Sequence, residues 1–401
     1  MKITVYKCKD CGPLAVNHLR NWLEDFIYLF LSPRLFAFFP LKFIRSSHNL
    51  LEKILIGSKL LSPKNNFPSH LISRRTTVFM EEAKKYGVRF QVLKSPFRYT
   101  NYFLMDLGNK NFFFEGLPRA EFLDSHLTQL IDDKVFVKSY LKQKNLPVAE
   151  GKAFLWFQKN QAYRWALKNL SYPLVVKPRF GSMSQHVTVN IQDGNSLKSA
   201  VRKAIAYSPA FIIEKFLPNT NIYRATVIDF ESVACVKRVP AHIIGDDIHN
   251  IKELVEIKNK DPRRGNPRQK DTTLYKLVAD DTTERLLKDK DYNFSSIPQK
   301  GEIVYLQEKI ILDLGADLFE VTPKIHPHNL RLFQDVARFF GVRLVGIDFL
   351  AKDIALSWKN QPCAIIELNS LPYIDMHHFP TEGKAVNISK ELVKMVFKYY
   401  Q

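Results

Sequence analysis

Cysteine is scarce in this chain, with Cys8, Cys11, Cys235 and Cys363 as the four cysteines among 401 residues. So few cysteines argue against a disulfide framework and favour a reducing compartment, so we expect a cytoplasmic protein. Cys8 and Cys11 have the spacing of half a zinc knuckle, but the other two cysteines are single and more than 200 residues further along. Because no second pair completes a tetrahedral ligand set, the sequence disfavours a zinc site.

Long apolar runs are also missing. The most apolar stretch, residues 26–44, is interrupted by Pro33, Arg34, Pro40 and Lys42. It is shorter than the roughly 20 apolar residues that a membrane-spanning helix needs. The first residues lack the apolar core and cleavage site of a secretory signal. We therefore expect neither a transmembrane segment nor export.

Acidic residues are few relative to basic ones. The chain has 40 Asp and Glu against 59 Lys and Arg, which gives a net charge of +19 at pH 7. Such a surplus attracts nucleotides, acidic substrates, nucleic acid or an anionic membrane surface, and charge by itself does not choose among them. The length predicts two to three domains, and 46% hydrophobic residues without any repeat period are typical of a soluble globular protein.

Residues 1–75 form a basic N-terminal extension with 12 basic and 4 acidic side chains. A helix is predicted between residues 15 and 31. Its apolar face comprises Val16, Leu19, Trp22, Phe26 and Phe30. Such a face docks on the body of the protein, on a partner or on a bilayer, and core docking is the commonest case.

The remaining chain divides by its pattern into three regions. We expect a small α/β domain over 76–150, a region of short strands over 151–240, and a third region over 241–401 with a charged insertion at about 245–300. Between Lys258 and Lys270 stand six basic residues and one acidic residue. This run suggests an acidic substrate, or else a solvated surface.

Three oxygen-bearing side chains are predicted to converge on two strands. Glu367 and Asn369 share one face because side chains alternate along a strand, and a hairpin-like return brings Asp348 beside them. Carboxylate and amide oxygens suit a hard cation, so this is a candidate site for Mg²⁺ bound to a nucleotide.

Two further segments complement this site. Lys177 lies in an apolar strand before Pro178, where a buried cation is costly unless an anion meets it, so Lys177 is a candidate phosphate ligand. The strand 211–218 ends in a proline-marked hinge, and backbone groups around Glu214, Lys215, Phe216 and Leu217 are placed to bond an adenine edge.

With these residues the chain resembles the ATP-grasp ligases, and it is most similar to the ATP-grasp modules of cyanophycin synthetase and of bifunctional glutamate-cysteine ligase/glutathione synthetase. The resemblance runs in one order from about residue 76 to 401. Its landmarks are Asp133-Lys134, 172–178, 214–218, 237–249, 257–265, 301–306, 321–327, 346–348, 367–369 and 380–384.

The resemblance implies a mixed α+β and α/β protein with the ATP-grasp fold, in which two α+β subdomains grip ATP after a small α/β domain. It implies ATP and Mg²⁺ as cofactors, with Mn²⁺ as an alternative. The implied reaction joins a carboxylate to an amine through an acyl-phosphate and releases ADP and phosphate. By motif position, the resemblance implies that the phosphates are bound by Lys134, Lys177, Gly181 and Ser184, and the metal by Asp348, Glu367 and Asn369. It places Arg238 and Arg264 near the substrate carboxylate or the transferring phosphoryl.

The chain departs from the family pattern at three places. The phosphate loop keeps Gly181 but has Ser184 and His186 where glycines are expected. The acid that would hold the ribose is absent after Pro218, and Asn221 is the substitute we assign. Gln307 follows Tyr305-Leu306 where an arginine is expected, so Lys309 becomes the candidate transition-state cation.

Three functions remain open from the sequence. The favoured one is an active ligase that forms an amide or peptide bond on an amino acid, a peptide or another acidic small molecule. The second is a nucleotide-binding homologue that has lost ligation and acts as a sensor or scaffold. The third is a basic nucleic-acid or membrane-surface protein, which no nucleic-acid-reading motif supports. A homo-oligomer is left open, and residues 1–75 are interpreted as an added module rather than an ATP-binding element.

Overall fold

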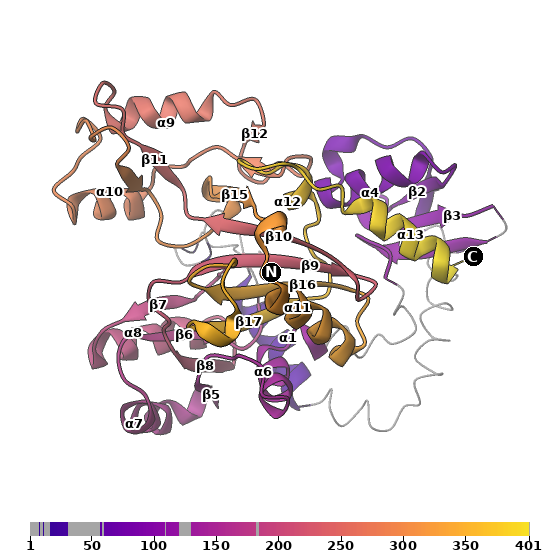
Figure 1. Cartoon of the computed structure of the whole chain (residues 1–401). Coiled ribbons are helices and arrows are strands. Elements are labelled where there is room, and N and C mark those ends of the chain that lie inside the picture. Colours follow the sequence, from indigo (N-terminus) through magenta and orange to yellow (C-terminus); the bar gives the residue numbers. More distant parts are fainter. Residues whose placement is uncertain are drawn as a thin grey trace.

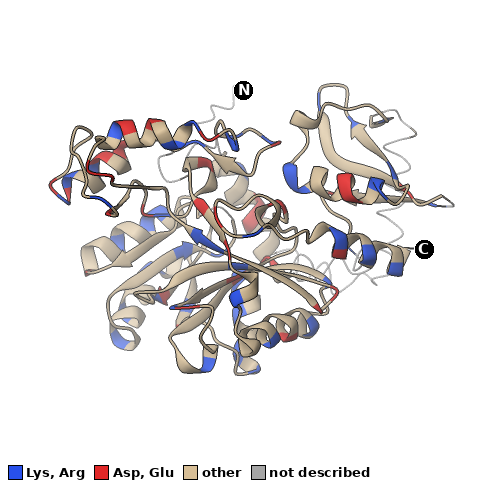
Figure 2. Ribbon diagram, turned by 45° about the horizontal axis from the view of Figure 1, so that its top comes forward, with Lys and Arg blue, Asp and Glu red and all other residues tan. Residues whose placement is uncertain are grey.

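The computed structural model describes residues 8, 11, 17–30, 57, 60–108, 110–119, 130–181 and 184–400. Val16, most of the apolar stretch 26–44 and the start of the helix expected from residue 127 lie outside the described residues. Among the described helices, none is both long and apolar enough to cross a membrane. Lys and Arg residues occur on every part of the drawn chain, so the positive charge is not confined to the N-terminal extension (Figure 2).

The first sheet is antiparallel, in the order β1 (Ser62–Lys64), β2 (Arg89–Lys94), β3 (Tyr99–Asp106) and β4 (Asn111–Glu115). Helix α4 (Arg74–Lys84) covers it together with α13 (Ser389–Tyr400), the last helix of the chain (Figure 1). Phe79, Phe103 and Phe114 are fully buried between these elements, and Leu392 joins them from α13. The C-terminus is therefore part of the same core as residues 62–117.

The second sheet has the antiparallel order β5 (Gly151–Leu155), β8 (Ala210–Lys215), β6 (Leu174–Pro178) and β7 (Thr188–Ile191). Helices α7 (Lys159–Asn169) and α8 (Gly194–Ile205) pack against it. The apolar face of α8, with Leu197, Val201 and Ala204, closes this core over Phe211 and Ile213.

The third sheet has the order β15 (Asp317–Glu320), β10 (Ser232–Val239), β9 (Asn221–Ile228), β16 (Leu344–Ala351) and β17 (Cys363–Asn369). Helices α11 (Pro327–Phe340) and α6 (Lys134–Gln143) contribute to its core, where Phe333 and Phe349 are fully buried. Because β9 and β10 belong here, the change from the second sheet to the third falls between Lys215 and Asn221, not at residue 240 as the sequence suggested.

The charged insertion forms a small unit of its own rather than a solvated surface alone. It contains β11 (His242–Ile244) paired with β14 (Ile303–Tyr305), β12 (Arg264–Gly265) paired with β13 (Leu274–Tyr275), α9 (Ile251–Asn259) and α10 (Asp281–Lys288). Ile243, Leu254, Leu287 and Val304 are buried in its own apolar core. The unit projects from one end of the third sheet (Figure 1).

The short elements complete the described chain. They are α12 (Asp375–His378) and the 3-10 turns η2 (Ser69–Leu71), η3 (Trp156–Gln158), η4 (Leu312–Leu314), η5 (Thr322–Lys324) and η6 (Trp358–Asn360).

Helix α1 (His18–Phe30) docks beside the second sheet, against Trp156 of η3 and Phe180 after β6. Trp22, Phe26 and Phe30 surround Trp156, with ring centroids 5.5–6.1 Å apart. The expected docking on the body of the protein is therefore present for these three residues. It is wrong for Leu19, which remains 69% exposed.

Candidate functional site

One large cavity, about 1510 Å³ in volume, lies between the second and third sheets and reaches residues of the first. Its walls contain every residue that the sequence assigned to the site except Arg264. These wall residues are Lys134, Lys177, Gly181, Ser184, Glu214, Lys215, Phe216, Leu217, Asn221, Arg238, Lys309, Asp348, Glu367 and Asn369. The fold thus gathers side chains spread over more than 200 residues of sequence.

Helix α6 begins at the cavity and places Lys134 in its wall. Asp133 caps the helix by accepting the Val135 and Phe136 N–H groups, and the same carboxylate binds Arg179 at 2.6 Å. This cap fixes Lys134 in the first turn, where its Nζ donates to the Gly181 carbonyl at 2.6 Å. Lys134 also lies 3.6 Å from the Glu367 carboxylate, so it connects the phosphate loop to the third sheet.

Lys177 is a buried cation, as the sequence predicted, and its protein partner is Glu214. The Lys177 Nζ lies 3.0 Å from Glu214 Oε2, while Lys138 pairs with the other oxygen. Burial would raise the pKa of Glu214, but Lys177 and Lys138 outweigh it and lower that pKa. Burial lowers the pKa of Lys138 to about 8. Sequence reasoning missed Lys138, although its position one helical turn after Lys134 was a usable signal.

In the predicted phosphate loop, the two positions where glycines were expected have a left-handed backbone. Ser184 has φ 56° and His186 has φ 51°, both in the left-handed region. Gly181 has φ 100°, and a Cβ there would lie 2.7 Å from the Tyr207 ring. Ser184 and His186 therefore adopt the backbone conformation expected of glycines at these positions, although a non-glycine residue at such φ values stores strain.

The predicted metal ligands lie on one face of the third sheet. Asp348 on β16 stands directly opposite Glu367 on β17, and Asn369 stands opposite Gly346. Asp348 is almost fully buried and is bound by Arg224 and, at 3.4 Å, by Arg238. Burial alone would raise the pKa of Asp348, but these two guanidinium groups hold it below its usual range. The carboxylate is therefore ionised, and both of its oxygens accept from guanidinium groups.

The donor set fits a hard divalent cation with a phosphate. Two carboxylates and an amide share the face, and the Asn369 Nδ2 is a buried donor with no hydrogen-bond partner among the described residues. Arg238 has a partnerless Nε of the same kind and also lines the cavity. Mg²⁺ would take oxygens of Asp348, Glu367 and Asn369, while the lysines opposite would meet phosphate oxygens.

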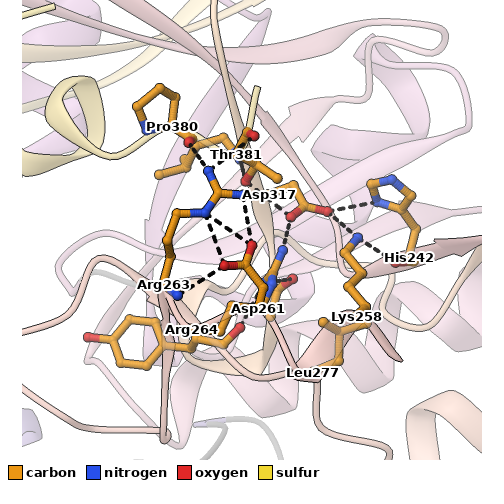
Figure 3. A network of polar contacts seen from close by, with 12 residues as sticks. His242, Lys258, Asp261, Arg263, Arg264, Leu277, Asp317, Pro380 and Thr381 are labelled. Carbon is orange, nitrogen blue, oxygen red and sulfur yellow. Dashed lines mark hydrogen bonds and ion pairs between the residues drawn. The ribbon is translucent and has the colours of Figure 1, made fainter. Parts of the chain in front are cut away.

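Arg264 is not part of this cavity, contrary to the role that the sequence gave it. Its guanidinium is buried against Asp317, and it also donates to the Tyr275 carbonyl at 2.8 Å. Lys258 binds the other oxygen of the same carboxylate at 2.5 Å (Figure 3). The positive charges of Arg264 and Lys258, both from this basic run, are thus paired with a carboxylate inside the protein. The pattern of basic residues could not reveal this, because Asp317 lies more than 50 residues further along the chain.

The segments predicted to bind adenine and ribose already make contacts within the protein. The N–H groups of Lys215 and Phe216 donate to carbonyls of Glu150 and Pro173, so an adenine edge would have to be read by the next N–H, that of Leu217. The side chain of Asn221 donates to the Lys352 carbonyl at 2.8 Å.

At the expected arginine position, Gln307 is buried and donates to Asp280 at 3.0 Å. Lys309 lies two residues further along and lines the cavity. Both residues therefore belong to the cavity side of the insertion.

Several cavity residues were not assigned to the site from the sequence. They include the cations Arg74, Arg75, Arg98, Arg268 and Lys270. Arg75 donates to the Leu371 carbonyl at 2.8 Å and stacks on Tyr373. In the cavity walls Lys and Arg outnumber Asp and Glu by more than two to one. The basic run before Lys270 was the available signal for Arg268 and Lys270, whereas nothing local marked the others.

Comparison with known proteins agrees with this geometry. No protein-family model matches the chain. It is 33% identical over 272 residues to a cyanophycin synthetase of Crocosphaera subtropica, which covers 67% of the chain and 30% of the relative. It is 28% identical over 325 residues to the glutathione biosynthesis bifunctional protein GshAB of Clostridium perfringens, which covers 80% of the chain and 41% of the relative. The chain thus spans about a third of the length of these relatives.

Among solved structures, a bifunctional glutathione synthetase from Pasteurella multocida superposes with a TM-score of 0.63 at 24% identity, over 82% of this chain and 44% of that one. In sequence and in fold, the chain belongs with the ATP-grasp proteins related to cyanophycin synthetases and GshAB proteins.

Proposed function

We propose that this chain is an ADP-forming ATP-grasp ligase that joins a carboxylate to an amine. The observation that carries the proposal is the arrangement of side chains around one cavity: Lys177 on the second sheet, Lys134 at the start of α6, and Asp348, Glu367 and Asn369 on the third sheet. Relatives named as synthetases with the same fold support it. ATP would bind with its phosphates between these two sets of side chains, with Mg²⁺ on the acidic one.

The proposed reaction proceeds through an acyl-phosphate. A substrate carboxylate oxygen attacks the γ-phosphorus and ADP leaves, and the amine then attacks the acyl carbon while phosphate leaves. Arg238 reaches the cavity beside Asp348, where a planar guanidinium can hold the carboxylate or the transferring phosphoryl. Bound Mg²⁺ would supply charge neutralisation at the phosphates.

The substrate we expect is acidic: an amino acid, a peptide or a similar small molecule. Arg74, Arg75 and Arg98 from the first domain face the cavity together with Arg268 and Lys270 from the insertion. These cations lie on elements other than those of the nucleotide site, so they mark a separate anionic position.

The test is a screen for ADP and phosphate release with Mg·ATP over amino acids and short acidic peptides. Glu367→Gln should lower the rate by at least about 100-fold while the protein stays folded, because it removes charge at the metal and keeps the shape of the side chain. Glu231→Gln is the matched control, since Glu231 is 72% exposed at its side chain and lies outside the cavity. Equal rates in wild type and Glu367→Gln would remove the metal role of Glu367.

A rival function is nucleotide binding without ligation. It is favoured by the missing ribose acid, because Asn221 is engaged with Lys352 and no carboxylate stands between residues 219 and 224. Tight Mg·ATP binding with no amine-dependent ADP release across the screen would support this rival over the ligase.

A further inference from the structure

The structure brings together two cysteines and two histidines that no step above uses. Cys8 and Cys11 precede helix α1, His18 is the first residue of that helix, and His186 lies in the phosphate loop of the second sheet. Their four ligand atoms lie within 4.8 Å of one another. Cys11 and His186 are buried, and Cys8 and His18 are half-buried.

We propose that these four residues bind one zinc ion. In a tetrahedral site with ordinary Zn–N and Zn–S bonds, two nitrogens lie about 3.3 Å apart and a nitrogen and a sulfur about 3.6 Å apart. The His18 and His186 Nε2 atoms are 3.4 Å apart. The sulfur-to-nitrogen distances are 3.5 Å for Cys8 to His186, 3.3 Å for Cys11 to His186 and 3.1 Å for Cys11 to His18. Four of the six ligand-to-ligand distances are thus within about 0.5 Å of their metal-bound values, and the other two do not exceed 4.8 Å.

The surroundings support a metal over a set of hydrogen bonds. The Nδ1 of His186 lies 2.7 Å from the Lys203 carbonyl, which requires Nδ1 to carry the proton and leaves the Nε2 lone pair aimed at the cluster. The N–H of Cys11 donates to the Cys8 carbonyl at 3.1 Å and closes the turn between the two sulfurs. Four converging soft lone-pair donors in a buried space suit a divalent cation, and two thiolates balance its charge.

The zinc would fasten the N-terminal extension to the phosphate loop. His186 has a left-handed φ of 51°, and its ring packs against Tyr207, whose hydroxyl donates to Gln185 at 2.7 Å. Gln185 and Ser184 line the ATP cavity. Helix α1 adds Tyr28 against Phe180, so metal and helix hold the same loop from two sides. This replaces the sequence-based interpretation of the extension as separate from the ATP-binding core.

The test uses the full chain, purified without a histidine tag from zinc-supplemented medium. Elemental analysis should find about one zinc per chain. The Cys8→Ser/Cys11→Ser variant should lose most of it, while Cys363→Ser should keep it, because Cys363 is half-buried on the far-removed strand β17. Wild-type zinc well below one per chain, or equal zinc in the double variant, would overturn the proposal.

A second measurement does not depend on how the variant folds. Wild-type protein stripped by a chelator and titrated with Co²⁺ should show the visible bands of a tetrahedral site and a thiolate charge-transfer band, saturating at one ion per chain. Octahedral Co²⁺ spectra without a thiolate band would rule out the Cys₂His₂ site.

Discussion

Replacing Asp317 by Asn should destabilise the protein strongly. Asp317 is 1% exposed, and its carboxylate forms ion pairs with Arg264 and, at 2.5 Å, with Lys258. It also accepts a hydrogen bond from the Thr381 hydroxyl at 3.1 Å. His242 lies 3.4 Å away on the same side (Figure 3). Asn keeps the shape of the side chain, but it leaves the Arg264 guanidinium buried without a counter-charge.

The magnitude follows from the burial of the pair. Both side chains of the Arg264–Asp317 pair are 1% exposed, and removing one partner of such a pair costs about 3–5 kcal/mol in the free energy of unfolding. Lys258 adds less, because its side chain is 23% exposed and water screens it. Removing both members, as in Asp317→Asn/Arg264→Gln, should recover a large part of the loss, since the buried guanidinium is then gone and only the partly exposed Lys258 has lost its counter-charge.

The assay is urea unfolding, since guanidinium would itself screen ion pairs. Circular dichroism and tryptophan fluorescence should both be followed, because a chain with several cores need not unfold in one step. Asp335→Asn is the matched control: Asp335 pairs with Arg338 on the surface with its side chain 65% exposed, and its loss should cost less than about 1 kcal/mol. If Asp317→Asn costs no more than this control, the buried pair does not stabilise the fold.

Three other predictions concern ligand, pH and packing. Saturating Mg·ATP should raise the melting temperature, since binding at 100 times the Kd adds about 2.7 kcal/mol to stability, and no shift would contradict a nucleotide site. Burial lowers the pKa of His378 to about 4, so between about pH 6.5 and pH 4 the unfolded chain binds a proton that the folded chain does not, and the free energy of unfolding should fall as the pH drops through this range. His378→Gln should flatten this slope in melting curves recorded at several pH values, and an unchanged slope would exclude His378 as its source. Phe333→Ala should cost about 3–5 kcal/mol in urea unfolding because the ring is fully buried against Phe349, and a loss below 1 kcal/mol would contradict the packing of the third core.

The sequence by itself determined the parts that depend on neighbours along the chain. Period-two alternation placed Glu367 and Asn369 on one face of a strand, and the structure has them there on β17. The buried position of Lys177 followed from the apolar residues around it, and the helix at His18–Phe30 followed from its spacing of apolar residues. The ATP-grasp fold could likewise be predicted, since its motifs occur in order along the chain.

Only the tertiary structure decided which charges meet. Arg264 was assigned to the substrate carboxylate or transferring phosphoryl by its motif position, yet folding buries it against Asp317, 53 positions away. The reverse holds for Cys8 and Cys11. His18 follows Cys11 by seven positions, but the fourth candidate ligand, His186, is 168 positions from His18 in sequence and comes within 3.4 Å of it only through the fold. Contacts between sheets arise from packing of whole elements, and no periodicity of side chains records them. Helix and strand patterns therefore specified the elements, whereas the ligand sets and buried ion pairs became visible when the elements were packed.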